Sequence, residues 1–201
     1  MSTAYADSGR TNQKQRTRAA LIAAARDLVA AGANPTVEEA AAAAAISRTT
    51  AYRYFPSQAA LLLAAHPEVD TRSLLTASAA ASDDPAARLD AVVETFTRLI
   101  VDSEPQQRTM LRLSLAADDA QRAELPLRQG RAIAWIEEAL EPLGPKMTKA
   151  QRHRLALAVR SAIGIESLVW LTDIAGLSRA EARKLMRWSA QAMLRAALDE
   201  V

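Results

Sequence analysis

The 201-residue sequence contains no cysteine, only two histidines and few aromatic residues, which make up 4% of the chain. Without cysteine, the chain forms no disulfide and offers no thiolate nucleophile. The two histidines, His66 and His153, are far apart in the sequence and do not supply the ligand cluster that a zinc site needs. We therefore expect stability to come from packing alone, with no bound metal and no cofactor.

Long apolar runs are also missing. No stretch of the sequence approaches the roughly 20 consecutive apolar residues of a membrane-spanning helix. Residues 1–11 lack the apolar segment of a secretory signal peptide. Half of the residues are hydrophobic, which is enough to build a core. We expect a soluble, cytoplasmic protein with no membrane partner.

Sequence motifs of enzymes are absent as well. The chain has no glycine-rich phosphate loop, no nucleophile elbow and no His-Glu metal motif. Its carboxylates stand at helical spacing from arginines, as Glu94 does from Arg98, and this spacing is typical of solvated ion pairs. We expect that the protein is not an enzyme.

Helix signals are what the sequence has in abundance. Apolar residues recur three, four and seven positions apart, and no stretch alternates as a half-buried strand would. These patterns predict an all-α fold. The expected helices cover residues 12–31, 36–44, 48–55, 58–65, a part of the alanine-rich stretch before residue 82, and residues 84–100, 110–115, 126–140, 148–172 and 178–198.

Residues 46–57 have the pattern of a DNA-recognition helix. Ser47 is a good N-cap residue, which makes Arg48 the first helical residue, and helical spacing turns Ala51 and Phe55 toward the core. The opposite face of this helix carries donors and aromatic rings and no acid. It consists of Arg48, Thr49, Tyr52 and Arg53, flanked by Thr50 and Tyr54. Residues 1–55 carry seven basic and four acidic side chains, a modest excess that favours a polyanion.

A second short helix precedes the recognition helix. Thr36 and Glu39 form a capping box at its start, and a tight turn at Ala45 leads to Ser47. Pro56 ends the recognition helix, because it lacks an amide hydrogen. Two short helices joined by a tight turn, the second with an exposed basic face, form the helix-turn-helix arrangement.

Residues 16–64 resemble the DNA-binding domain of the TetR family of transcriptional regulators. The ordered set that carries the resemblance is Ser47, Thr50, Tyr52 and Tyr54-Phe55-Pro56-Ser57. The resemblance implies an N-terminal three-helix helix-turn-helix DNA-binding domain and a C-terminal helical domain for ligand binding and dimerisation. We expect a flexible arm over residues 1–11, the DNA-binding domain over residues 12–65 and the regulatory domain over residues 66–201.

Two positions depart from the family pattern. Ala45 occupies the turn position where the family usually has glycine, which costs about 1 kcal/mol if the backbone is left-handed there. Gln58 stands where the family often has a basic residue, so a phosphate contact is neutral or missing at this position.

Double-stranded DNA is the partner that the recognition helix and the resemblance predict. Arg48 lies in the first turn, where a recognition helix meets base edges. By resemblance, Tyr52, Tyr54 and Thr36 contact phosphates; packing inside the small domain is the alternative for the two tyrosines. The predicted DNA-binding residues are Arg16, Thr36, Ser47, Arg48, Thr49, Thr50, Tyr52, Arg53 and Tyr54.

The last two expected helices, residues 148–172 and 178–198, carry more apolar surface than one core requires. A four-helix interface between two copies would bury this surface, and it predicts a two-fold homodimer. Two-fold symmetry in turn predicts a palindromic operator, with recognition helices about 34–36 Å apart or a multiple of this distance. The residues predicted for the dimer face are Leu185, Ser189, Ala192, Met193 and Ala196.

Aromatic residues beyond residue 80 are the candidates for an effector site. They are Phe96, Trp135 and Trp170, with Met110 as an adaptable neighbour. The resemblance implies a small hydrophobic or aromatic effector that releases the DNA, which would make the protein a ligand-responsive repressor. Core packing explains the same residues, so the alternative is a constitutive DNA-binding helical protein with no small-molecule effector.

Overall fold

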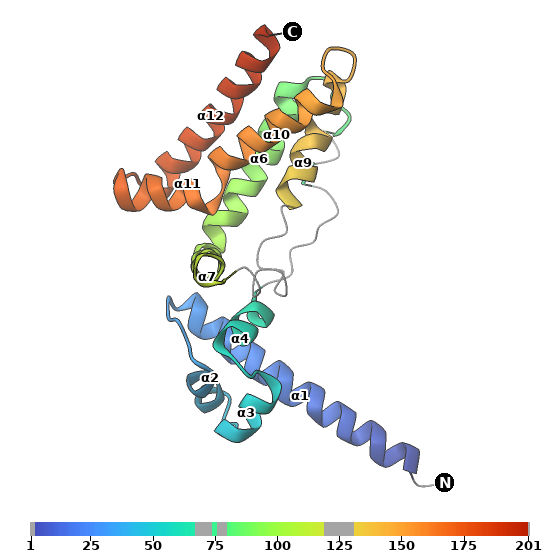
Figure 1. Ribbon diagram of the computed structural model, residues 1–201, viewed down its shortest axis with the longest axis vertical. Helices are drawn as coiled ribbons and strands as arrows, with labels where there is room; N and C mark the ends of the chain where they lie inside the picture. The colour runs from blue at the N-terminus through green and yellow to red at the C-terminus, as the bar shows by residue number, and fades with distance from the viewer. Residues whose placement is uncertain (1–2, 67–73, 76–79, 119–130, 201) are drawn as a thin grey trace. The chain divides into compact units, whose positions relative to one another are not determined.

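The computed structural model describes residues 3–66, 74–75, 80–118 and 131–200 (Figure 1). Within these ranges the regular structure is entirely helical, which confirms the all-α fold. The chain divides into two compact units, Met1–Glu68 with Pro105–Leu127, and Val69–Glu104 with Arg128–Val201.

The first unit contains four helices from the N-terminal part of the chain: α1 (Thr3–Ala30), α2 (Val37–Ala43), α3 (Arg48–Tyr54) and α4 (Gln58–Ala65). Most of α7 (Glu104–Ala116) belongs to it as well. Helix α1 packs along α4 and α2, and α2 packs on α3 (Figure 1). The short helices α2 to α4 begin and end close to the residues that the sequence predicts.

The start of α1 differs from the prediction. We expected an irregular arm before Asn12, whereas the helix begins at Thr3. Residues 3–11 contain a single glycine and no proline, so nothing in their sequence interrupts a helix that has already formed downstream. The low apolar content of this segment, on which the prediction of an arm rested, therefore did not exclude a helix.

Local signals set the boundaries of α2, α3 and α4. Thr36 forms the predicted capping box with Glu39, and Ser47 and Ser57 accept hydrogen bonds from the amides of Thr50 and Ala60. Helix α1 is followed by Gly32 in the left-handed region (φ 84°), where glycine carries no β-carbon penalty. These caps satisfy backbone groups that water would otherwise have to reach.

Small residues dominate the core of the first unit, which is made of Leu21, Ala25, Val37, Ala40, Ala41, Ala51, Phe55, Leu61 and Ala65. Five of these nine are alanines, so the four helices approach one another closely. Phe55 and the leucines fill the space between them. Arg18 stacks its guanidinium over the Phe55 ring at 5.4 Å from the centroid, a cation–π contact between α1 and the end of α3.

The second unit is built from α6 (Pro85–Asp102), α9 (Arg131–Ala139), α10 (Lys149–Ile163), α11 (Ile165–Val169) and α12 (Arg179–Asp199), with the 3₁₀-helix η1 (Glu141–Leu143) and the π-helix η2 (Trp170–Ile174). Helix α12 packs against both α6 and α10, as Figure 1 also shows. The predicted starts at Asp84, Thr148 and Ser178 are confirmed, since each of these residues caps its helix. The start predicted at residue 126 lies outside the described residues.

Residues 148–172 do not form the single helix that we expected. Helix α10 ends at Ile163, Gly164 is extended (φ −84°, ψ 179°), and α11 starts at Ile165. A β-carbon at position 164 would collide with the side chains of Arg160 and Glu166. Because glycine has no β-carbon, position 164 leaves room for the side chains of Arg160 and Glu166, which form an ion pair beside the break.

This region also contradicts our expectation that no stretch of the sequence is apolar enough to span a membrane. Lys149–Ile174 is long and apolar enough to cross a membrane by length and composition. Core helices of soluble proteins pass the same test, and in this structure 44% of the apolar window is buried within the chain. The break at Gly164 also divides the segment into two shorter helices.

Ion pairs connect α6 with α12. Arg187 bonds both carboxylate oxygens of Asp90 at 3.1 and 2.6 Å, and its Nη1 lies 2.8 Å from Glu94. Arg183 also bonds Glu94. Glu94 therefore pairs across to α12, and the pair with Arg98 that the spacing suggested is replaced by these longer-range contacts. Because each arginine meets its carboxylate in a defined geometry, the network fixes the register of the two helices.

Arg88 is a buried cation in the second unit, with 6% of its surface exposed. Its guanidinium donates to the carbonyl oxygens of Ala139 (3.1 Å), Glu138 (2.7 Å) and Ala80 (2.7 Å), and more weakly to that of Ser82 (3.4 Å). Two of these carbonyls lie at the end of α9, where no intrahelical partner exists. Arg88 is therefore the cap that joins α9 to α6.

Replacing this cap should destabilise the protein. In Arg88→Met the four carbonyl oxygens lose their donor, and we expect the free energy of unfolding to fall by about 3 kcal/mol. Urea unfolding followed by circular dichroism measures this change. Arg98→Met is the matched control, because Arg98 is an exposed arginine of the same helix, and it should change stability by less than about 0.5 kcal/mol. Equal stability of the two variants would contradict the role of Arg88.

Candidate nucleic-acid interface

Helix α3 is oriented by its two buried residues. Ala51 is fully buried and Phe55, at the C-cap, is 3% exposed, which confirms the inward face that helical spacing predicts. The Ser47 hydroxyl accepts from the Thr50 amide at 3.3 Å and donates to the Thr50 hydroxyl at 2.9 Å. These contacts fix the first turn of the helix and leave its opposite face to solvent.

The predicted DNA-binding residues lie on exposed surface of the first unit. Arg48, Thr49, Tyr52 and Arg53 are exposed, and Thr50 and Tyr54 are half-buried. The side chain of Arg48 has 73% of its surface exposed.

The remaining predicted residues are exposed as well. Thr36 and Ser47 are exposed N-cap residues of α2 and α3, and Arg16 is exposed on α1. Arginine side chains lie over both tyrosines, Arg48 over Tyr52 and Arg53 over Tyr54.

One acid reaches this face from the neighbouring helix. Glu38 lies in the first turn of α2, and its Oε1 accepts a hydrogen bond from the Tyr52 hydroxyl at 2.7 Å. The same oxygen lies 2.9 Å from Nη2 of Arg48. The sequence pattern missed this contact because the outer face of α3 alone contains no acid. Arg48 and Tyr52 are one helical turn apart, so one carboxylate from another helix can meet both.

The cluster changes the acidity of its members. The hydrogen bond from Tyr52, followed by the backbone amide of Glu38 and the charge of Arg48, lowers the pKa of Glu38 from its ordinary value. The same hydrogen bond raises the pKa of Tyr52. Glu38 is consequently ionised and Tyr52 protonated throughout the physiological range.

Gln58 has a structural role in place of the phosphate contact often found at its position in the family. Its side-chain amide donates to the carbonyl oxygen and the side chain of Asn34, both at 3.2 Å, and to the carbonyl oxygen of Pro35 at 3.0 Å. Arg112 of α7 bonds the same Asn34 side chain. The loop before α2 is thereby held against α4, and this loop leads directly to the Thr36 cap.

The four residues predicted for an effector site lie in different surroundings. Phe96 and Trp135 pack on each other with ring centroids 6.1 Å apart, and Arg160 lies over the Phe96 ring at 5.5 Å. Trp170 is 58% exposed and lines a pocket of about 390 Å³ in the second unit. The other residues of this pocket are Ala162, Glu166, Ser167, Leu171, Leu185, Met186 and Ser189.

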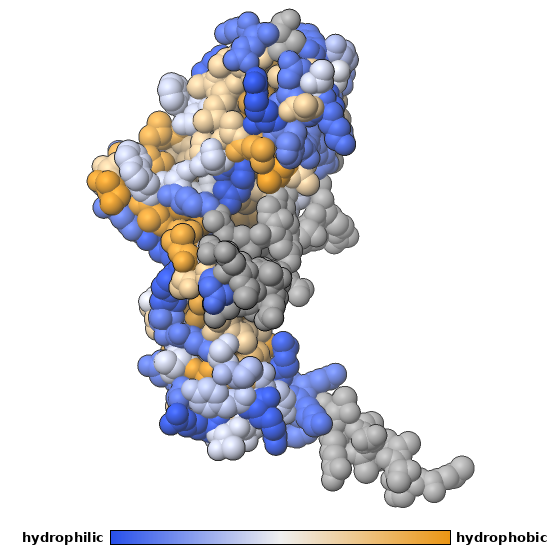
Figure 2. All heavy atoms as spheres, viewed as in Figure 1, coloured by the Kyte–Doolittle hydropathy of each residue, from blue (hydrophilic) through white to orange (hydrophobic). Residues whose placement is uncertain are grey.

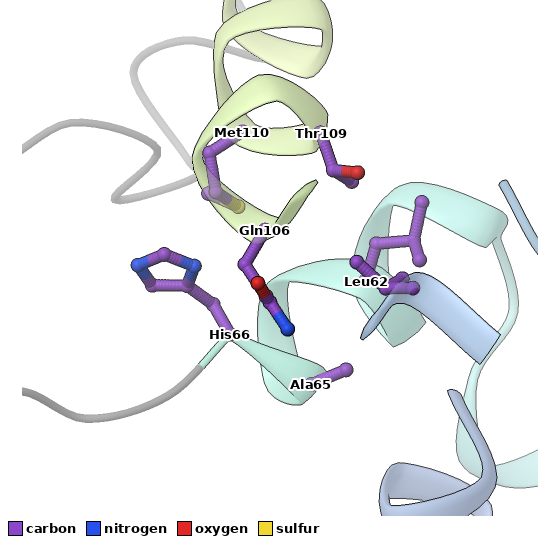
Figure 3. Close-up of a pocket in the computed structure, with 7 residues that line it drawn as sticks. Leu62, Ala65, His66, Gln106, Thr109 and Met110 are labelled. Carbon is purple, nitrogen blue, oxygen red and sulfur yellow. The ribbon is translucent and has the colours of Figure 1, made fainter. Parts of the chain in front are cut away.

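Met110 belongs to the first unit. Together with Leu62, Ala65, His66, Gln106 and Thr109, it lines a pocket between the end of α4 and α7 (Figure 3), and Val29 of α1 completes the lining. The volume of this pocket is about 10 Å³, which corresponds to about one water molecule. Its size does not admit a drug-sized ligand.

Apolar side chains gather on the surface of the second unit over α11 (Figure 2). The exposed large hydrophobic residues of α10, η2 and α12 are Leu157, Trp170, Ile174, Leu185 and Trp188. Of the five residues predicted for a dimer face, Leu185 and Ala196 are exposed, and Ser189, Ala192 and Met193 are half-buried. Among the described residues no cluster of three metal-ligating side chains occurs.

Comparison with known proteins agrees with this geometry. The sequence model described as "Bacterial regulatory proteins, tetR family" matches residues 21–65, from the middle of α1 to the end of α4. A crystal structure of a TetR transcriptional regulator from Rhodococcus sp. RHA1 superposes with a TM-score of 0.55 at 20% sequence identity, over 90% of this chain and 97% of the other. This likeness concerns the fold. No curated protein matches the chain in sequence.

A helix-turn-helix domain with an exposed basic recognition helix, followed by further helices in the part of the chain that the structure describes, defines a DNA-binding transcriptional regulator. By this match, the DNA-binding domain over residues 21–65 is that of the TetR family of these regulators. Regulators of this family typically have no enzymatic activity.

Titration of Glu38 tests the cluster on α3. Its pKa should lie below the ordinary value of a glutamate, and Tyr52→Phe should raise it again because the largest cause of the shift is removed. Since the pKa is depressed in the folded state, the stabilisation is present above the unfolded-state pKa, near 4.3, and is lost as the pH falls through the folded-state value. Carboxyl-carbon NMR measures the titration. Tyr54→Phe serves as the control and should leave the pKa of Glu38 unchanged.

Proposed function

We propose that the protein is a cytoplasmic, dimeric repressor that binds a palindromic operator and is released from it by a small hydrophobic or aromatic effector. The observation that carries the proposal is the exposed face of α3, where Arg48 stands in the first turn with most of its side chain in solvent. A buried or fully paired arginine at this position would argue against base recognition.

Within this proposal, the residues of α3 divide the work of binding. Arg48 is placed to read a base edge in the major groove, where an arginine fork matches guanine. Thr49, Thr50 and Arg53 lie beside it. Tyr54, which packs partly against the core, is a candidate for contact with the backbone of the duplex, and Tyr52 can make such a contact only when its hydroxyl leaves Glu38. Thr36, Ser47 and Arg16 supply further polar contacts to phosphates. The duplex thus meets sequence-reading and register-setting groups on one face.

Dimerisation is supported by the apolar surface of α10, η2 and α12. Trp170, Ile174 and Trp188 are each more than half exposed, at 58%, 73% and 61%. Contiguous apolar surface of this kind marks an interaction site. A second copy that packs its α12 against this surface would cover Leu185, Ser189, Ala192, Met193 and Ala196. The two-fold axis of such a dimer accounts for a palindromic operator.

An effector site in the second unit is supported by the pocket beside Trp170. Its volume of about 390 Å³ lies in the range that small-molecule sites occupy, and it combines an indole ring with aliphatic walls and one carboxylate, that of Glu166. Phe96 and Trp135 remain candidates on the neighbouring helices. Leu185 and Ser189 belong both to this pocket and to the proposed dimer face. A bound effector and the partner subunit would therefore contact the same two residues.

A constitutive DNA-binding protein is the second candidate function. The close packing of Phe96 on Trp135 favours it, because two aromatic rings in contact act as core and leave little room for a ligand between them. The two candidates differ in one property, the response of operator affinity to a bound small molecule.

Arg48→Ala should weaken binding to a selected operator by about ten- to a hundredfold and relax the base preference at one position of each half-site. The reason is the loss of a bidentate contact to a base edge. Binding selection from random duplexes, followed by titration, measures both effects. Lys14→Ala, which removes an exposed charge of α1, should weaken all sequences alike. An unchanged sequence preference of the Arg48 variant would refute its role as a reader.

Leu185→Glu should weaken the dimer by at least tenfold, because a charge would be buried without a partner in the interface. Sedimentation at micromolar concentration measures the monomer fraction. Leu115→Glu is the matched control, since Leu115 is a 74% exposed leucine of the first unit outside the proposed face. If both variants remain as dimeric as the parent protein, the proposed face is wrong.

A hydrophobic or aromatic compound that binds beside Trp170 should quench its fluorescence and lower operator affinity by about tenfold, which corresponds to about 1.4 kcal/mol of coupling. A thermal-shift screen supplies the compounds. Trp170→Phe should abolish the quenching, whereas Trp188→Phe should retain it. Saturation of the pocket without any loss of operator affinity would favour the constitutive DNA-binding protein.

A further inference from the structure

The contact of Glu38 with the recognition helix is unusual for a surface that meets a polyanion. The carboxylate lies at the edge of the DNA-facing residues, with 35% of its side chain exposed, and both of its contacts on α3 use the same oxygen. DNA bound to this surface would bring its phosphates close to the Glu38 carboxylate, and these negative charges would repel each other. A residue that only joined α2 to α3 would not need a charge here, because α2 and α3 already pack through Ala40, Ala41 and Ala51.

The donors that Glu38 occupies are those that phosphates need. A tyrosine hydroxyl has a single hydrogen to donate, and that of Tyr52 is used on Glu38. The Arg48 guanidinium pairs with the same carboxylate through Nη2, and its other donors remain available for a base. To contact the phosphate of an arbitrary sequence, Tyr52 must break its bond to Glu38, and the phosphate must then lie beside the carboxylate.

Contact with a base edge carries a smaller penalty. In the major groove the bases lie away from the phosphate rows, and Arg48 can present its remaining donors to a base while Nη2 stays on Glu38. The carboxylate also restricts the guanidinium to one orientation, which lowers the entropy that base recognition must overcome. Charge and orientation therefore both act against non-specific binding more than against specific binding.

We propose that Glu38 is a specificity-determining residue of this regulator, which withholds Tyr52 and Arg48 from the phosphates of arbitrary DNA and orients Arg48 for one base. The proposal rests on the proposed role of α3 as the reading helix. Glu38 acts through these two side chains as a positioning residue and does not itself read the sequence.

The test compares Glu38→Gln with the full-length parent protein on two duplexes, one of random sequence and one selected by the parent protein. On the random duplex we expect Glu38→Gln to bind about fivefold more tightly, the effect of one charge–charge contact in water at about 4 Å. The slope of log affinity against log salt should steepen by about one unit, because one more phosphate contact forms. The ratio of specific to non-specific affinity should fall by a similar factor.

Asp27→Asn is the matched control, because it removes one exposed acid from α1 of the same unit without touching α3. It should leave the ratio of affinities unchanged. Introducing Glu38→Gln into a Tyr52→Phe, Arg48→Ala background should have less than half of its effect in the parent, since the residues through which it acts are gone. Thermal unfolding of each variant separates this effect from a loss of folding.

Two results would overturn the proposal. One is that Glu38→Gln binds the random duplex with an affinity within twofold of the parent's and with the same slope against salt. The other is an equal change in Asp27→Asn, which would make the effect one of net charge. If the parent selects no preferred sequence, sequence-specific regulation fails instead, and the random-duplex titration still decides whether Glu38 restrains Arg48 and Tyr52.

Discussion

The close packing of Ala51 against the alanines of α2 is the constraint on which the DNA-facing surface depends. Ala51 and Ala40 are fully buried and Ala41 nearly so, and the absence of larger side chains lets α2 and α3 approach closely. That short distance brings Glu38 within 2.7–2.9 Å of two side chains on α3. A larger residue in place of Ala51 would separate the helices and break these contacts together with the core.

Helix starts were the part of the fold that the sequence predicted best. Thr36, Ser47, Ser57, Asp84, Thr148 and Ser178 each cap a helix whose start was predicted, because a cap depends on residues within one turn of each other. Features that depend on distant residues were missed or misjudged. Glu38 meets α3 only through the fold, Glu94 pairs with α12, and Gly164 breaks a helix because of the side chains around it. Spacing along one helix contains no information on these partners.

The second unit separates polar and apolar contacts between its helices. The arginines of α12 that face α6, Arg183 and Arg187, bind the carboxylates of Asp90 and Glu94, while Leu185 and Trp188 of the same helix remain exposed. Directional ion pairs fix the position of α12 within the chain. Its other side can therefore present apolar surface without weakening the unit, which is the arrangement expected of a helix that serves a core and an interface at once.

Ala45 has a consequence for how firmly α3 is held. Its backbone is left-handed (φ 53°), a conformation that costs an alanine about 1 kcal/mol relative to glycine. An alanine also restricts the unfolded chain more than a glycine does, and this restriction returns about 0.4–1 kcal/mol. At a positive φ the strain is the larger of the two effects, so Ala45 lowers the stability of the fold slightly while it restricts the backbone of the turn. With fewer backbone conformations open to the turn, the recognition helix samples a narrower range of angles than a glycine turn would allow.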